Sequence, residues 1–194
     1  MLKFAVVDLE TTGGHGEDNR IMEIGIALMD GSEVVGTYHS LVDPGQPISP
    51  FVRELTGITD EMVEGQPQFG AIAEHVAELL RDRIFVAHNV LFDNKFMTVE
   101  LKRCCIKFNP PRLCTVKLAR KVFPGQPSYS LHKLTESLGL PDFNHHRALD
   151  DTLAAAAILK AALEKVGEAG VMNNVVNLSN AKKQAVGAAI VPSC

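Results

Sequence analysis

Four of the 23 acidic residues lie in three stretches of the chain where a buried element is expected to begin or end. Asp8 and Glu10 lie two residues apart in "KFAVVDLE", so on an extended strand both side chains leave the same face. Asp93 follows the apolar stretch "RIFVAH", and Asp151 begins the alanine-rich stretch "DTLAAAAILKAALEKV". Carboxylates gathered at one end of a sheet repel one another, and divalent cations relieve this repulsion. Oxygen-only ligands suit Mg²⁺ or Mn²⁺, and a pair of such ions can clamp a phosphoryl group during its displacement.

Each of these carboxylates also has a purely structural explanation. Asp8 and Glu10 fit equally well the polar end of a strand that has reached solvent. Asp93 falls in the first turn of a predicted helix, where the helix dipole favours a negative charge. Burying unpaired charge is costly, so the metal interpretation requires these side chains to point inward together. The spacing of the residues leaves both explanations open.

The segment "HHRALDD", residues 145–151, brings two histidines and two aspartates to the start of the last predicted helix. The residues that share a helical face with Asp151 are Ala155, Ile158 and Ala162. This small and apolar face predicts that Asp151 points toward the sheet. Asp150 shares its row with further alanines, which leave its direction ambiguous, and it also suits a helix cap. Either His145 or His146 could accept a proton from an attacking water near neutral pH.

The elements that must position these residues begin with strands. "KFAVVDLE" is a nearly continuous apolar run typical of a central strand, and two β-rich runs follow around the turn at residues 30–32. Short helical pieces come next, broken at Gly57 and Gly65. The remaining predicted elements are a helix over 69–81, the strand "RIFVAH", the helix "NVLFDNKFMTVELKRC", the strand "PRLCT" and the helices "VKLARKVF", "SLHKLTESLGL" and "RALDDTLAAAAILKAALEKV". This order predicts one layered α/β domain.

Composition restricts the class of protein. With 194 residues, of which 46% are hydrophobic, the chain is long enough for one domain with its own core. No apolar run reaches the roughly 18 residues of a membrane helix and no signal peptide is evident, so we expect a soluble cytoplasmic protein with no membrane partner. The net charge of −4 argues against nonspecific coating of nucleic acid. Periodicity fades after Gly167, which predicts a domain over residues 1–167 and a weakly structured tail over 168–194.

Other residue types that bind metals or phosphate receive structural interpretations. The four cysteines lack the paired C-x-x-C spacing of a zinc site. His39, like three other histidines, has no acidic partner at ligand spacing and is interpreted as a surface or boundary residue, and His88 as a hydrogen-bonded structural residue. Lys117, Arg120 and Lys121 form a basic helical face, which is either a solvated surface or a track for substrate phosphates.

Three motifs, taken together, resemble a known family. "DLETTG" at residues 8–13, "AHNVLFD" at 87–93 and "HRALDD" at 146–151 resemble the three exonuclease motifs of the DEDD superfamily, histidine subtype. Their order and spacing are most like those of the proofreading epsilon subunit of bacterial DNA polymerase III and its relatives, over roughly residues 3–166. The stretches "GITDEMV" and "YSLHKLTESLGL" also resemble linking segments of this family.

The resemblance implies a ribonuclease-H-like α/β fold, whose mixed central sheet of about five strands is antiparallel for three strands and then parallel, with flanking helices. It also implies a 3′→5′ exonuclease that uses two divalent cations, Mg²⁺ or Mn²⁺. The implied substrate is single-stranded DNA or a frayed 3′ end, and the implied products are nucleoside 5′-monophosphates. By position, the metal ligands are Asp8, Glu10, Asp93 and Asp151, and the general base is His146.

The resemblance also distinguishes between the paired residues of "HHRALDD". In the family's third motif the histidine precedes the aspartate by five residues and is followed two residues later by an alanine. His146 and Asp151 satisfy this pattern with the alanine in place. His145 and Asp150 have the same separation, but an arginine stands where the alanine should be. We therefore expect His145 and Asp150 to have structural roles.

Substrate contacts are implied in the first two motifs. The backbone of Thr11 and Thr12 matches the family's contact with the 3′-terminal nucleotide, and the turn that follows the strand is expected to leave backbone N–H groups free there. Asn89 matches the polar residue of the second motif, which supports the ligands or contacts substrate. One departure is Cys114-Thr115, where many relatives have an aspartate-threonine pair. Because that position is not a metal ligand in the family, the departure does not argue against activity.

Two alternatives stay open. RNA-trimming enzymes such as ribonuclease T and oligoribonuclease belong to the same superfamily, so RNA is a second candidate substrate. The other alternative is a non-catalytic exonuclease-like module that binds nucleic acid ends or a polymerase, although no carboxylate of the set is missing. A DNA polymerase subunit is thus a candidate partner, but the tail carries no recognisable polymerase-binding or clamp-binding segment.

Overall fold

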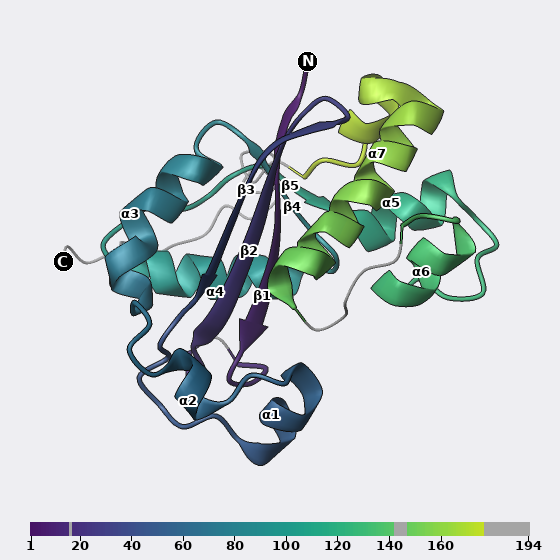
Figure 1. Cartoon of the computed structure of the whole chain (residues 1–194). Helices are drawn as coiled ribbons and strands as arrows, with labels where there is room; N and C mark the ends of the chain where they lie inside the picture. Colours follow the sequence, from purple (N-terminus) through teal and green to yellow (C-terminus); the bar gives the residue numbers. More distant parts are fainter. Residues whose placement is uncertain (16, 142–146, 177–194) are drawn as a thin grey trace, which may run out of the picture.

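A five-stranded mixed sheet runs through the centre of the computed structural model, which describes residues 1–15, 17–141 and 147–176 (Figure 1). The strands are β1 (Lys3–Thr11), β2 (Ile21–Asp30), β3 (Glu33–Leu41), β4 (Ile84–Ala87) and β5 (Arg112–Cys114). Their order across the sheet is β3-β2-β1-β4-β5. β2 pairs antiparallel with β1 and β3, whereas β4 pairs parallel with β1 and β5. The predicted mixed sheet, antiparallel for its first three strands and parallel beyond them, is confirmed.

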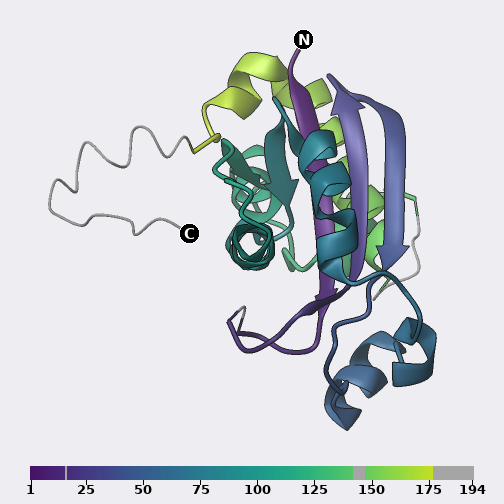
Figure 2. The same ribbon diagram turned by 90° about the vertical axis from the view of Figure 1, so that its left-hand side faces the viewer.

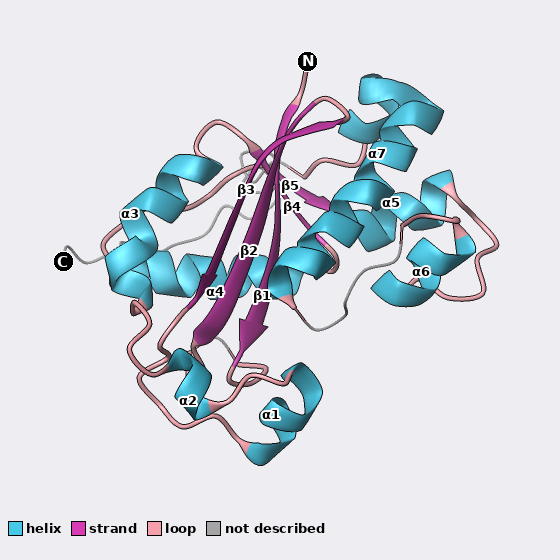
Figure 3. Cartoon of the chain, viewed as in Figure 1, coloured by secondary structure: helices cyan, strands magenta, loops and turns pink. Residues whose placement is uncertain are grey.

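Helices cover both faces of this sheet (Figures 2 and 3). On one face lie α3 (Phe69–Leu80) and α4 (Val90–Arg103). On the other face lie α7 (Ala148–Met172) and α5 (Thr115–Val122), with α6 (Leu131–Ser137) packed beside α7. The short helices α1 (Pro50–Thr56) and α2 (Asp60–Val63) sit beyond the C-terminal end of β1 (Figure 1). The helices predicted from periodicity are all present.

β1 is apolar on both sides because it is covered on both sides. Phe4 and Val6 pack against the side of α7, and alternate residues of the strand pack against α3 and α4. Asp8 and Glu10 continue the row of Phe4 and Val6, since side chains alternate with a period of two. The acidic pair therefore faces the side of the sheet on which α7 lies.

Local sequence signals fix where two of the helices, α4 and α1, begin. Asn89 adopts a left-handed backbone conformation, with φ of 75°, between β4 and α4. Asparagine tolerates this conformation better than most residues, so the chain can turn sharply and begin α4 at once. Ser49 caps α1 by accepting a hydrogen bond from the Val52 N–H, and Pro50 occupies the first helical position.

The chain beyond Gly167 still packs on the domain over the residues that the structure describes. Gly167 interrupts α7 with φ of 69°, after which the helix continues to Met172 with Val171 fully buried. Val176 then exchanges two backbone hydrogen bonds with Arg112 at the start of β5. The tail predicted from residue 168 therefore does not separate there, while residues 177–194 lie outside the described part. Within that part, no helix is both long and apolar enough to cross a membrane.

Candidate active site

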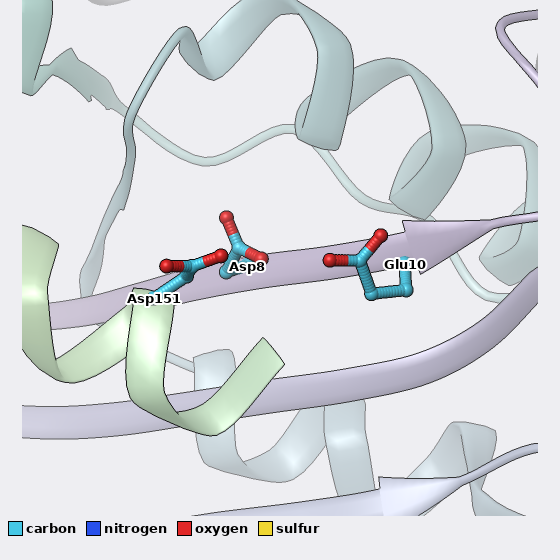
Figure 4. A group of neighbouring side chains, drawn as sticks. All are labelled: Asp8, Glu10 and Asp151. Atoms are coloured by element: carbon cyan, nitrogen blue, oxygen red, sulfur yellow. The ribbon is translucent and has the colours of Figure 1, made fainter. Parts of the chain in front are cut away.

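Three carboxylates meet toward the C-terminal end of β1. One oxygen from each of Asp8, Glu10 and Asp151 lies within 4.8 Å of the other two. Figure 4 shows Asp8 and Glu10 on β1, with Asp151 beside them on the first turn of α7. Asp8 and Glu10 are partly exposed, whereas Asp151 is buried. The structure thus brings together three of the four carboxylates that the motifs identify.

The fourth carboxylate, Asp93, lies in the first turn of α4 and is only 3% exposed. Its carboxylate does not belong to the group of three whose oxygens lie within 4.8 Å of one another. Electrostatics still connects it to that group, since its charge acts on Asp8 and the charge of Glu10 acts on it. Asp93 is therefore a buried fourth carboxylate that interacts with the close group of three.

Burial and mutual repulsion oppose ionisation of these groups when no cation is present. Burial raises the pKa of Asp8 well above its usual value, and the neighbouring charges of Asp93 and Asp151 raise it further. Burial, followed by the charge of Asp151, raises the pKa of Glu10 to about 7. Burial also raises the pKa of Asp93 to about 8. The site is thus short of positive charge.

The donor set fits a hard divalent cation. Asp8, Glu10 and Asp151 each offer a carboxylate oxygen, and no sulfur or imidazole belongs to this group among the described residues. Mg²⁺ and Mn²⁺ prefer such oxygen donors. A cation held among these side chains would favour their ionised forms and so reverse the rise in their pKa values.

The predicted general base, His146, and its neighbour His145 lie outside the residues that the structure describes. The described chain resumes at Arg147, and α7 begins at the next residue. Asp151 is 9% exposed, and the residues that continue its buried face are Ala155, Ile158 and Ala162. Asp150 is only partly buried. The inward orientation that periodicity predicts for Asp151 is therefore confirmed.

The loop after β1 holds both threonines predicted to bind substrate. The hydroxyl of Thr11 donates to the Gly13 carbonyl at 2.8 Å, and that of Thr12 accepts from the Arg20 N–H at 3.0 Å and from the Gln46 amide at 2.6 Å. The N–H of Thr12 donates to the Arg20 carbonyl at 3.0 Å. The prediction that this turn leaves its N–H groups free is wrong at Thr12, because the loop folds back on itself. Contact with substrate stays a prediction for both threonines.

A buried glutamate on α4 holds this loop, and the sequence analysis does not single it out. Glu100 is 1% exposed and accepts hydrogen bonds from Arg20, at 2.6 and 3.1 Å, and from Arg103, at 3.1 Å. Arg103 also donates to the carbonyl of Glu17 at 2.7 Å. A signal was available, because Glu100 stands seven residues after Asp93, on the buried face of the same helix. α4 therefore connects the loop after β1 to the acidic site.

A second buried glutamate, Glu23 on β2, holds the start of α7. It is fully buried and accepts hydrogen bonds from Arg147 at 2.9 and 3.1 Å, from His39 at 2.7 Å and from the Ala148 N–H at 3.1 Å. His39 lies at the surface, as expected, but it has an acidic partner on the neighbouring strand that the spacing along the chain does not reveal. The available signal was a single charged residue inside the apolar run "IMEIGIAL".

The remaining candidates have simpler surroundings. Asn89 is exposed where β4 ends, which leaves its side chain accessible beside Asp93. The ring of His88 bonds to the Thr115 hydroxyl at 2.8 Å and to the Tyr129 carbonyl at 2.9 Å, and burial lowers the pKa of His88. The structural interpretation of His88 is thus confirmed.

The predicted basic face is present on α5. Lys117, Arg120 and Lys121 are exposed and, with residues 173–176, line a hollow of about 400 Å³. The guanidinium of Arg120 stacks over the ring of Tyr129 at 5.3 Å. Whether this face carries substrate phosphates stays a prediction.

Comparisons with known proteins agree with this geometry. A family model described as exonuclease, of the RNase T type, matches residues 5–159. The 3′-5′ exonuclease DinG of Staphylococcus epidermidis is 40% identical over 163 residues, which are 84% of this chain and 18% of that protein. The DinG protein of Staphylococcus aureus strain MRSA252 is 37% identical over 166 residues, which are 85% of this chain and 18% of that protein. The chain thus spans less than a fifth of the length of these relatives.

Solved structures show the same architecture. Exonuclease X in complex with 5′ overhanging duplex DNA is 31% identical, with a TM-score of 0.70 over 86% of this chain and 93% of that chain. Escherichia coli Exonuclease I in complex with a dT13 oligonucleotide is 21% identical, with a TM-score of 0.74 over 85% of this chain and 42% of that chain, and this likeness concerns the fold alone. The predicted ribonuclease-H-like fold is confirmed.

Proposed function

The chain belongs to the DEDD/RNase T family of 3′→5′ exonucleases, and we propose that it releases nucleoside 5′-monophosphates from the 3′ end of single-stranded or frayed DNA. The observation that carries this proposal is the meeting of Asp8, Glu10 and Asp151 within 4.8 Å, with Asp93 buried nearby. A site of carboxylate oxygens alone suits the cations that serve phosphoryl transfer. The DNA-bound state of Exonuclease X supports DNA as the substrate.

Two divalent cations, Mg²⁺ or Mn²⁺, are the proposed cofactors, and Asp8, Glu10, Asp93 and Asp151 are the residues that would hold them. When bound, such ions activate the attacking water and stabilise the leaving oxygen. The protein's own part is to hold the carboxylates on rigid elements. β1 lies in the middle of the sheet, while α4 and α7 are each fixed by buried apolar contacts on one of its faces. This arrangement keeps the donors in place before substrate arrives.

The proposed general base is His146. It immediately precedes Arg147, whose guanidinium is fixed by two hydrogen bonds to Glu23, so the chain next to His146 has a defined anchor. An imidazole takes a proton from water efficiently near neutral pH. Thr11, Thr12 and Asn89 are proposed to contact the terminal nucleotide, because they lie where β1 and β4 end, beside the carboxylates.

Digestion of end-labelled strands tests the proposal. We expect stepwise shortening of single-stranded DNA with Mg²⁺ or Mn²⁺, no shortening with EDTA, and slower shortening of an RNA strand of the same sequence. Asp8→Asn should abolish the activity and keep the far-UV circular dichroism spectrum, whereas Asp18→Asn, at an exposed position, should leave the rate unchanged. Faster shortening of RNA would contradict the DNA proposal and identify an RNA-trimming enzyme. No shortening of either strand, with metal-independent binding, would instead identify a non-catalytic module.

A proofreading role beside a DNA polymerase is the narrower form of this proposal. The likeness of the three motifs to the epsilon subunit supports it. Proofreading predicts that a mismatched 3′ end on a duplex is shortened several times faster than a paired 3′ end, because the mismatched end frays more readily. Equal rates on the two duplexes would contradict the proofreading role without affecting the exonuclease proposal.

A further inference from the structure

Glu23 is a fully buried carboxylate beside the acidic site, yet its oxygens serve other partners. One oxygen accepts hydrogen bonds from the Arg147 guanidinium and from His39, and the other accepts the Ala148 N–H. Burial acts to raise the pKa of Glu23, but the hydrogen bonds from Arg147, His39 and Ala148 outweigh it and lower that pKa. Glu23 therefore stays ionised in a place where the pKa of Glu10 rises.

The strand register puts Glu23 directly opposite Glu10. The two residues are paired across β1 and β2, and opposite side chains on antiparallel strands leave the same face about 5 Å apart. Like charges in this arrangement are destabilising unless they are compensated. Arg147 supplies the compensation, and it lies next to His146 in the chain. Glu23 lies opposite the proposed metal ligand Glu10 and forms an ion pair with Arg147. Arg147 directly follows the proposed general base, His146, in the sequence.

Gly25 brings the same strand against the first turn of α7. A Cβ atom at this position would lie 2.4 Å from the Ala148 carbonyl oxygen, so only glycine permits the observed approach. Gly25 lies two residues after Glu23 and opposite Asp8, and it therefore faces the same side. Glu23 accepts a hydrogen bond from the beginning of α7, and Gly25 leaves room for α7 to approach β2 closely. Both residues therefore contact the first turn of α7.

The hydrogen bonds of that turn extend this contact to Asp151. The N–H groups at the start of a helix have no intrahelical acceptor, and Glu23 accepts the one at Ala148. The N–H of Asp151 donates to the Arg147 carbonyl at 3.0 Å, as the first bond of the helix. A displacement of Arg147 would therefore move the first turn of α7, on which Asp151 lies.

We propose that Glu23 is a positioning residue of the active site, which acts through Arg147 and the Ala148 N–H to place Asp151. The role of Glu23 in catalysis rests on the proposed exonuclease function, whereas its role in placing Asp151 does not.

The test compares Glu23→Gln, Arg147→Gln and the double variant with a matched control. Arg147 is 43% exposed, so Arg147→Gln should fold even if Glu23→Gln does not. The control is Asp30→Asn, which breaks an aspartate–arginine pair with Arg83, at 2.9 Å, at the far end of the same strand. Four quantities are measured below the melting temperature of every variant. They are the rate of amide hydrogen exchange over residues 147–151, the Mn²⁺ affinity, and kcat and KM on single-stranded DNA.

We expect exchange over residues 147–151 to become at least about tenfold faster in the single variants. Mn²⁺ affinity and kcat should each fall by about 10-fold or more, with KM within about threefold of wild type, as for other residues that orient metal ligands. The double variant should be no worse than the poorer single variant, because both changes remove one contact. Asp30→Asn should lower the melting temperature and leave the exchange rate, the Mn²⁺ affinity, kcat and KM unchanged.

Exchange and Mn²⁺ affinity within twofold of wild type in both single variants would overturn the proposal. The proposal would also be overturned if Asp30→Asn changed exchange and Mn²⁺ affinity as much as the single variants do, because the effect would then follow from lower stability alone. Exchange and Mn²⁺ binding need no cleavage of substrate. If the wild-type protein cleaves no strand while these two quantities respond as expected, the exonuclease function fails and the placement of Asp151 by Glu23 stands.

Discussion

Replacing Asp93 by asparagine should change how the stability of the metal-free protein depends on pH. Asp93 is 3% exposed, and burial raises its pKa from the usual 3.8 to about 8, with the charge of Glu10 adding to the rise. The folded protein therefore keeps a proton that the unfolded chain releases above about pH 4. The stability that this group contributes is fully present below about pH 4 and is lost as the pH rises through about 8.

The size of the effect follows from the width of that window. Within it, the free energy of unfolding falls by about 1.4 kcal/mol for each pH unit, which amounts to on the order of 4 kcal/mol between pH 5 and pH 8. Asparagine has no proton to lose, so Asp93→Asn should lack this part of the decline. Any change in packing or hydrogen bonding caused by the amide is the same at every pH and does not affect the slope.

The assay is urea unfolding followed by circular dichroism in EDTA at four pH values from 5 to 8. The free energies of wild type and Asp93→Asn should diverge with pH, the variant becoming the more stable. Asp18→Asn removes the same formal charge from an exposed position and serves as the control, with a slope equal to that of wild type. Saturating Mn²⁺ should stabilise wild type more at pH 8 than at pH 5. Parallel curves for wild type and Asp93→Asn in EDTA would refute the assignment of a buried, proton-retaining carboxyl at position 93.

Three further outcomes are expected. Mn²⁺ at about one hundred times its Kd should stabilise the wild-type protein by about 3 kcal/mol, a melting-temperature rise of about 5–10 °C in calorimetry, and Asp8→Asn should lose most of that rise. His146→Ala should lower kcat by about 100-fold or more, whereas His145→Ala should stay within about threefold of wild type. The wild-type kcat should rise with pH around 6.5, and a flat pH profile would speak against an imidazole base. Gly25→Ala should lower the free energy of unfolding by about 3 kcal/mol, because the added methyl group meets the backbone of α7. In the control Gly36→Ala, the methyl group meets only a side-chain carbon at 3.9 Å, and the loss should be less than about 1 kcal/mol. Equal urea midpoints for the two variants would disprove the close approach at Gly25.

The direction in which a charged side chain leaves its own strand or helix could be predicted from the sequence. The spacing of Asp8 and Glu10 on a strand gave their shared face, and the apolar row after Asp151 gave its inward direction. These predictions succeed because the periods of a strand and a helix are local properties of the backbone. The relation of Asp93 to the other carboxylates was not predictable in this way, since no local pattern tells on which face of the sheet α4 packs.

Contacts between distant segments account for most of what the sequence analysis misses. Glu23 and Arg147 are separated by 124 positions, and Arg20 and Glu100 by 80. Nothing in the spacing of either pair indicates that they meet, because tertiary packing alone brings them together. A charged residue in an apolar run, as at Glu23, does show that some partner must exist, since burial of an unpaired carboxylate is costly. It does not show which residue the partner is.

The order of the carboxylates along the chain has a consequence for biosynthesis. Asp8 and Glu10 leave the ribosome long before Asp151, which is on the last helix of the described fold. A growing chain that has reached residue 140 can pair its sheet strands but lacks the third member of the close carboxylate group. On the proposed function, cation binding at that group, and with it cleavage of nucleic acid, would begin only after the last helix has docked. The order of the elements would then keep the domain inactive during synthesis until α7 has joined the sheet.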